Sequence, residues 1–146
     1  MPIRVETRFF YPVDWPLISR RVRFETRGPH GSGRCWVCGR PHGREVRTLP
    51  DGRWFDAELH SWRDGRGADA AWPDVVEACA IRSTRVILAA CHRDHDPTNN
   101  RPSNLMAACQ RCHLGHDREY HRRQFRITIL LRRALGDLFV GPYRRW

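Results

Sequence analysis

Apolar residues recur at helical spacing in two parts of the chain. Near the N-terminus, Trp15, Ile18 and Val22 are spaced as on one face of a helix. Near the C-terminus, a second helical pattern begins at about Gln110 and continues to Gly136, a residue type that often ends helices. The pattern therefore predicts a short N-terminal helix and a long C-terminal helix.

Stretches rich in β-branched and apolar residues predict strands between these helices. STRVILAA, residues 83–90, is typical of one buried strand, and LMAA, residues 105–108, of a short second strand or a turn. Residues 44–56 hold an Asp51-Gly52 turn signal between two stretches of strand character, which predicts a hairpin. Together with the helices, these elements predict an α+β fold.

Residues 57–78 show the weakest pattern. WPDVVEACA is compatible with a helical turn after Pro73, and DGRGADAA is typical of an exposed loop. We interpret Trp54, Trp62 and Trp72, in and near this segment, as core aromatics, although such side chains could instead stack on nucleic-acid bases. The sequence predicts no further structure here.

Arginine supplies all of the basic side-chain charge, because the sequence contains no lysine. The formal net charge is +10 and the isoelectric point is about 10.5. A guanidinium group can bind a phosphate through two hydrogen bonds, so a surface of this kind suits a polyanion. GC-rich codon usage would explain the absence of lysine equally well, but it would not explain the net charge. The charge favours a nucleic-acid partner, which we expect to be duplex DNA.

The length of 146 residues is that of one ordinary domain. No apolar run reaches the roughly 18 residues of a membrane span, and the N-terminus MPIRVETRFF lacks the apolar stretch of a signal peptide. We therefore expect a cytoplasmic protein without a membrane partner. No coiled-coil or other dimer signal is present, and whether the chain forms a homodimer stays open.

Four of the six cysteines form two C-x-x-C units, CWVC and CQRC. The cysteines of these two knuckles are Cys35, Cys38, Cys109 and Cys112. Two such units can complete the tetrahedron that Zn²⁺ prefers, and a shared ion would close a loop of roughly 70 residues and stabilise the fold. A redox dithiol or free thiols are the alternative. Cys79 and Cys91 lack such spacing and are predicted to be small buried residues.

The run HRDHDPTNN, followed by SNL, by CxxCH and by HD, resembles the HNH endonucleases, which have a ββα-metal core. The resemblance spans about Val86 to His121 and extends more loosely to the CWVCG knuckle, whereas Glu45 to Arg82 match nothing in the family. It implies a small zinc-stabilised ββα-metal (HNH) domain with an N-terminal helix, a hairpin insertion and a long basic C-terminal helix. Residues 1–146 would form this one domain, with an N-terminal extension and helix (1–34), the zinc knuckles and HNH core (35–117), and the C-terminal helix and tail (118–146).

The resemblance also implies roles for four residues. Asp94 and His113 would bind a catalytic metal ion, His95 would be the general base, and Asn104 would order the loop around it. Because adjacent residues of an extended segment point to opposite sides, Asp94 could face the ion while His95 faces the attacking water. We therefore predict an endonuclease that hydrolyses DNA phosphodiesters with Mg²⁺ or another divalent ion such as Mn²⁺, Ni²⁺ or Zn²⁺.

Further side chains could complete the metal site. Asp117 lies one helical turn after His113 and is our candidate for the third ligand, at a position where relatives often carry histidine. His92 lies two residues before Asp94 and would point the same way on a strand, which makes it a further candidate. His116 is another, or a DNA contact. Ordinary polar residues at the rim are the alternative for His92, His116 and His121.

The last helix could hold the substrate. Its candidate phosphate-binding residues are Arg118, Arg122, Arg123 and Arg126. Apolar residues between them, including Phe125 and Leu130, are expected to face the core, and the tail YRRW could extend the basic surface. A solvated charged surface without a ligand is the alternative.

Two other functions are compatible with the sequence. One is a non-catalytic, zinc-stabilised DNA-binding module, although such a protein would be expected to lack the base or a metal ligand, and this sequence has both. The other is a nuclease that acts on RNA or on structured or modified DNA, which the composition does not exclude.

Overall fold

The structure is a computed structural model that describes residues 5–139. The chain divides into two compact units, Met1–His113 and Leu114–Trp146. The first unit is a mixed α+β fold with a four-stranded and a two-stranded sheet, and the second holds most of one long helix. Among residues 5–139, no helix is both long and apolar enough to cross a membrane.

The two-stranded sheet is a hairpin of β5 (Leu88–His92) and β6 (Leu105–Cys109). The strands are antiparallel, with Leu88 opposite Cys109 and Cys91 opposite Met106. Every residue of β6 is buried, because this short apolar run lies in the centre of the first unit. The strand predicted for residues 105–108 is therefore confirmed.

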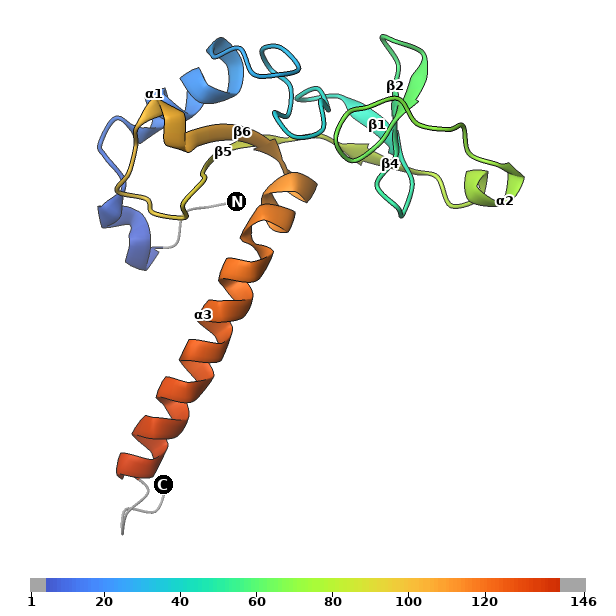
Figure 1. Cartoon of the computed structure of the whole chain (residues 1–146). Helices are drawn as coiled ribbons and strands as arrows, with labels where there is room; N and C mark the ends of the chain where they lie inside the picture. The colour runs from blue at the N-terminus through green and yellow to red at the C-terminus, as the bar shows by residue number, and fades with distance from the viewer. Residues whose placement is uncertain (1–4, 140–146) are drawn as a thin grey trace. The chain divides into compact units, whose positions relative to one another are not determined.

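The N-terminal segment is helical and lies alongside this hairpin (Figure 1). Its elements are the 3-10 helix η1 (Val5–Phe10), α1 (Trp15–Arg20) and the π-helical stretch η2 (Arg21–Glu25). The three apolar residues that predicted a helix here all pack on the core, namely Trp15, Ile18 and Val22. α1 starts without a side-chain cap, because the N-cap Asp14 makes no side-chain capping bond. The helix is accompanied instead by burial of this apolar face.

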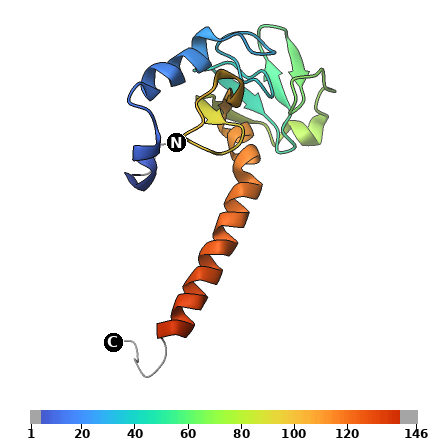
Figure 2. The same cartoon turned by 60° about the vertical axis from the view of Figure 1, so that its left-hand side comes forward.

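The second sheet has the strand order β3-β2-β1-β4. Its strands are β1 (Glu45–Thr48), β2 (Trp54–Asp56), β3 (Ser61–Arg63) and β4 (Arg82–Arg85). β1 and β2 form the predicted hairpin, and Gly52 in the turn has a φ of +106°, a conformation that favours glycine. Figure 2 shows β1, β2 and β4 from a second direction, as a sheet distinct from the β5–β6 hairpin.

The buried strand predicted for residues 83–90 is wrong as a single element. Its first half is β4, which is exposed throughout and pairs with β1, whereas its second half belongs to β5. At the break, the backbone N–H of Val86 donates to Arg44 O at 2.9 Å and that of Ile87 donates to Gln110 Oε1 at 3.0 Å. Hydrogen bonds to residues far away in the sequence therefore mark the place where β4 ends and β5 begins. The apolar run alone does not reveal this break.

The helical turn predicted after Pro73 is confirmed as α2 (Val75–Ala78). A capping box starts this helix, because Glu77 N–H donates to Asp74 Oδ1 at 2.7 Å and Asp74 N–H donates to Glu77 Oε2 at 3.1 Å.

The predicted burial of single cysteines and tryptophans is confirmed in part. Cys79, just after α2, is exposed, so its predicted burial is wrong, whereas Cys91 is buried as predicted. Trp54 and Trp62 are core residues, whereas Trp72 is 67% exposed and contradicts that interpretation.

The long helix α3 (Gln110–Phe139) follows β6 directly. Its first residues belong to the first unit and the remainder to the second. The helix passes through Gly136, so the end predicted there is wrong. A single glycine inside a helix costs about 1 kcal/mol relative to alanine and does not by itself end the helix.

Candidate functional site

Four cysteine sulfurs meet inside the first unit. Cys35 and Cys38 come from the first knuckle, Cys109 ends β6 and Cys112 lies in the first turn of α3. All four Sγ atoms lie within 4.8 Å of one another, and Cys38 Sγ is 3.7 Å from Cys109 Sγ. A zinc–thiolate tetrahedron with Zn–S bonds of about 2.3 Å has S···S edges of about 3.8 Å. This cluster, which the spacing predicted, could hold a metal ion such as zinc.

Backbone hydrogen bonds shape the first knuckle. Cys35 N–H donates to Arg40 O and Gly39 N–H donates to Cys35 O, each at 2.9 Å. Gly39 has a φ of +77°, so a side chain at this turn position would strain the backbone. Cys109 N–H donates to Cys35 Sγ at 3.3 Å and thereby ties β6 to the knuckle. The cysteines are thus held by the fold around them.

The four thiols alter one another's acidity. Hydrogen bonds from its neighbours, led by Cys112, lower the pKa of Cys109. The contact with Cys109 raises the pKa values of Cys38 and Cys112. For Cys35 the contact with Cys109 also raises the pKa, but the contacts with the other two thiols outweigh it and bring the value to about 6. Protons are therefore shared unequally within the cluster, and a divalent ion would replace those that remain.

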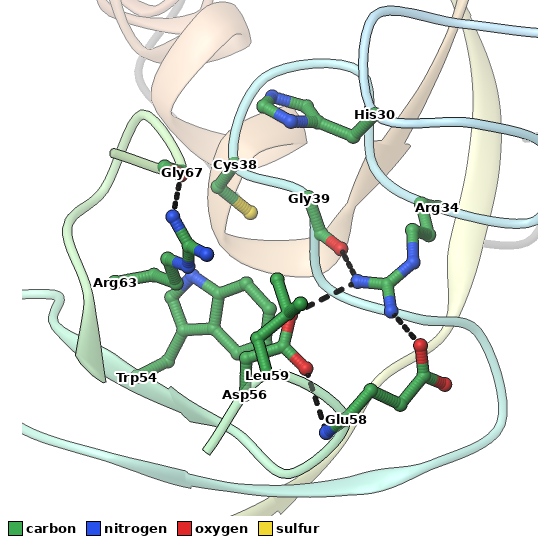
Figure 3. Close-up of a pocket in the computed structure, with 10 residues that line it drawn as sticks. All are labelled: His30, Arg34, Cys38, Gly39, Trp54, Asp56, Glu58, Leu59, Arg63 and Gly67. Atoms are coloured by element: carbon green, nitrogen blue, oxygen red, sulfur yellow. Dashed lines mark hydrogen bonds and ion pairs between the residues drawn. The ribbon is translucent and has the colours of Figure 1, made fainter. Parts of the chain in front are cut away.

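A cavity of about 310 Å³, lined by both charged and apolar side chains, lies beside Cys38, between the first knuckle and the second sheet (Figure 3). Its charged groups are largely paired with one another. Arg34 donates to Gly39 O at 2.9 Å, to Asp56 Oδ2 at 3.3 Å and to Glu58 Oε2. Since these bonds join the knuckle to β2 and the residues after it, the cavity belongs to the packing around the cysteines.

The second group of candidate residues lies in the loop of residues 93–104, between β5 and β6. Asp94 is exposed, and its carboxylate accepts three hydrogen bonds from within the loop. Asn104 Nδ2 donates to Oδ1 at 2.8 Å, Asp96 N–H donates to Oδ1 at 2.9 Å and Asn99 Nδ2 donates to Oδ2 at 2.7 Å. These bonds, the one from Asn104 first, lower the pKa of Asp94 to about 2. The carboxylate is ionised at neutral pH and fixed in orientation.

Asn104 bridges the two ends of this loop. Besides its bond to the Asp94 carboxylate, its Oδ1 accepts from Asp94 N–H at 3.3 Å and its Nδ2 donates to Asn99 O at 2.8 Å. These are bonds of the kind expected of a residue that orders the loop, and whether the loop serves a reaction stays a prediction. Sequence reasoning missed that Asn99 holds Asp94, because asparagine is common in loops whatever its contacts.

The backbone near His95 differs from the extended segment that we expected. β5 ends at His92, a turn follows, and His95 has a φ of +62°. Asp94 and His95 do not lie on a strand, so the prediction that they point to opposite sides of one is wrong. Positive φ is uncommon for non-glycine residues and is enriched at functional sites, although exposed His60 shares it with a φ of +50°.

His92 is the last residue of β5, two residues before Asp94. It is buried, packs on the ring of Trp15, and its Nε2 is 3.0 Å from Asn100 Oδ1. The expectation that it points the same way as Asp94 on a strand is wrong, because the strand ends before Asp94. His92 links the core to the loop through Asn100.

The remaining candidates lie on α3. His113 is the last residue of the first unit, directly after Cys112. His116 and Asp117 belong to the second unit, where Asp117 Oδ2 is 3.8 Å from His121 Nε2.

The phosphate-binding arginines predicted on α3 are all exposed, namely Arg118, Arg122, Arg123 and Arg126. Phe125 and Leu130 are 66% and 61% exposed, so the expectation that they face the core is wrong. The tail YRRW lies outside the described residues.

Comparisons of the chain with models of protein families, with curated proteins and with solved structures gave no match.

Proposed function

We propose that the chain is a metal-dependent endonuclease of the HNH kind, which hydrolyses phosphodiester bonds in DNA. The proposal rests on the carboxylate of Asp94, which is ionised and held in one orientation by Asn104 and Asn99 beside a histidine. An exposed carboxylate that a loop immobilises in this way is suited to bind a cation. The order of these residues along the chain is that of the HNH motif.

Asp94 retains capacity for a ligand after its internal bonds are counted. A carboxylate has about four lone-pair sites. Three of them accept the bonds from Asn104, Asp96 and Asn99. About one site therefore remains, and it belongs to an oxygen that is already fixed in space, so little conformational freedom is lost when a cation binds.

His95 is proposed as the general base. Imidazole is the side chain best suited to take a proton from water near neutral pH. Its backbone N–H donates to His92 O at 3.4 Å, and the left-handed backbone conformation gives its ring a direction that an extended strand would not. We propose that the His95 ring accepts the proton of the water that attacks phosphorus.

The second knuckle, which contains Cys112, leads into the other part of the proposed site. Because Cys112 belongs to the four-cysteine cluster, a metal ion there would fix the first turn of α3 and with it the neighbouring His113. We propose His113 and Asp117, one helical turn apart on α3, as further ligands of the catalytic ion. When bound, a divalent ion would stabilise the charge on the phosphate and on the leaving oxygen.

A zinc-stabilised module that binds DNA without cutting it is the second candidate. It is favoured by the bond from Asp96 N–H to Asp94, which is the pattern of an ordinary Asx turn and needs no cation. The exposed arginines of α3 would serve either function.

The two candidates differ in a metal-readdition assay on supercoiled plasmid. The protein is first treated with EDTA at a concentration that leaves its zinc content unchanged, and Mg²⁺, Mn²⁺, Ni²⁺ or Zn²⁺ is then added singly. Endonuclease activity predicts nicked or linear plasmid with at least one ion and intact plasmid in EDTA. Plasmid that is retarded on the gel but uncut with every ion would favour the binding module, and single-stranded, modified and RNA substrates in parallel would define the substrate class.

A further inference from the structure

Arg40 is a buried cation beside the cysteine cluster. It is 4% exposed, and among the described residues it is the one buried arginine. Its Nη1 lies 3.9 Å from Cys38 Sγ and 4.0 Å from Cys109 Sγ. Arg34, Arg53 and Arg63 of the same unit face carboxylates, whereas no carboxylate among the described residues pairs with Arg40. The side chains that Arg40 Nη1 approaches are therefore those of Cys38 and Cys109.

A guanidinium group removed from water without a counter-charge is strongly destabilising. The Nε of Arg40 is buried and has no hydrogen-bond partner among the described residues, which adds to this cost. Four thiolates around Zn²⁺ carry a formal net charge of about −2, and such a centre in turn needs a nearby cation when it is buried. Each charge therefore offsets part of the cost of burying the other.

We propose that Arg40 is the counter-charge of the metal centre, and that it increases the affinity of the four cysteines for their ion because its positive charge lies beside two of the four sulfurs. Arg40 lies two residues after Cys38, so the knuckle that supplies two ligands also supplies the balancing charge. Arginine suits this position because its planar guanidinium reaches two sulfurs through one nitrogen and keeps the other nitrogen for a second bond.

The β1–β2 hairpin holds this guanidinium in place. Arg40 Nη2 donates to Gly52 O at 2.9 Å, and the guanidinium carbon lies 5.8 Å from the centre of the Trp54 ring. Arg111 Nη2 donates to Asp51 O at 3.2 Å and so fixes the same turn from α3. Residues 45–56, which have no counterpart in the HNH resemblance, thereby gain a role, because they orient this charge.

The test compares three variants with the wild type: Arg40→Met, Arg40→Lys and Arg44→Met. Arg44→Met is the matched control, because it removes the same charge from an exposed position on the same segment. The zinc-loaded proteins are mixed with a coloured chelator at one fixed pH, and the rate of zinc release is measured. The absorption band for thiolate-to-metal charge transfer is measured on the Co²⁺-substituted proteins.

Loss of a residue that supports metal ligands typically weakens metal binding by about 10–100-fold. We expect zinc release from Arg40→Met to be faster by about this factor, with Arg40→Lys between it and the wild type and Arg44→Met unchanged. The charge-transfer band of Arg40→Met should move to longer wavelength, because loss of a nearby cation raises the energy of the sulfur electrons. A purely structural role of Arg40 would leave that band in place.

Two results would overturn the proposal. One is an Arg40→Met protein whose zinc release and Co²⁺ band equal those of Arg44→Met. If Arg40→Met retains no metal, Arg40→Lys decides, since a variant that keeps the positive charge and loses the metal just as completely would show that packing, and not charge, is required. Neither result depends on DNA cleavage, so the outcome is separate from that of the nuclease proposal.

Discussion

The indole of Trp15 stacks on the imidazole of His92, with ring centroids 5.0 Å apart and planes inclined by 15°. Through this contact α1 packs on the last residue of β5, from which the loop of residues 93–104 departs. His92 then reaches Asn100 inside that loop, with Nε2 and Oδ1 3.0 Å apart. The N-terminal helix thus supports the loop that carries the candidate catalytic residues.

Trp15→Ala should reduce the free energy of unfolding by about 2 kcal/mol, because it removes a partly buried aromatic ring from the core and from His92. Leu17→Ala, on the exposed side of the same helix, should change it by less than about 0.5 kcal/mol. Urea unfolding followed by circular dichroism measures both. Equal effects of the two substitutions would contradict the packing role of Trp15.

Cys109→Ala should abolish binding of the structural ion and unfold the first unit, because it removes one of four ligands and leaves the other thiols in an incomplete site. Cys79→Ala is the matched control, since Cys79 is exposed and lies outside the cluster. Zinc content by elemental analysis and helix content by circular dichroism provide the measurements. A folded Cys109→Ala protein with full zinc content would show that the cluster is not the metal centre.

Asn104→Ala should raise the pKa of Asp94 from about 2 toward the ordinary value of an aspartate, because the bond from Asn104 is the main cause of the shift. A carboxyl with a lowered native pKa stabilises the fold above its unfolded pKa of about 3.9, and this contribution is lost as the pH falls toward 2. NMR titration of the side-chain carboxyl carbon reads the pKa directly. An unchanged titration midpoint would show that Asn104 does not hold the carboxylate in solution.

The double variant Arg123→Gln/Arg126→Gln should bind DNA less tightly and with a weaker dependence on salt. Each lost phosphate contact is expected to reduce the slope of log K against log salt by about 0.9. Arg27→Gln/Arg66→Gln removes the same charge from exposed positions of the first unit. DNA affinity is measured by fluorescence anisotropy at several salt concentrations. If the two double variants show the same slope of log K against log salt, binding depends on the overall charge and not on α3.

Local signals made part of this fold predictable. Trp15, Ile18 and Val22 predicted α1 because helical periodicity is a property of neighbouring residues, and the knuckle cysteines were identified because metal geometry requires their spacing. β3 was missed, since its three residues are stabilised by cross-strand partners, such as Phe55 opposite Trp62, that no local pattern encodes. The division at Val86 was missed for the same reason.

The candidate site shows the same division between local and distant information. The residues Asp94 and Asn104 could be chosen from their order in the sequence, but not the bonds that lock them together. The end of β5 at His92 and the left-handed backbone of His95 were not predicted either, because no local pattern in the sequence encodes them. The burial of Arg40 was equally hidden, because an arginine after a knuckle is ordinarily a surface residue.

The proposed role of His95 as the base is best tested by comparing His95→Ala with His60→Ala. His60 is an exposed histidine of another loop and also has positive φ, so it controls for the backbone effect of the substitution. Cleavage of a labelled DNA duplex under single-turnover conditions is measured together with DNA affinity and zinc content. We predict that His95→Ala loses at least about 100-fold in cleavage rate with affinity and zinc content unchanged, while His60→Ala cuts like the wild type. Equal cleavage by the two variants, or loss of folding in His95→Ala, would contradict the assignment of His95 as the base.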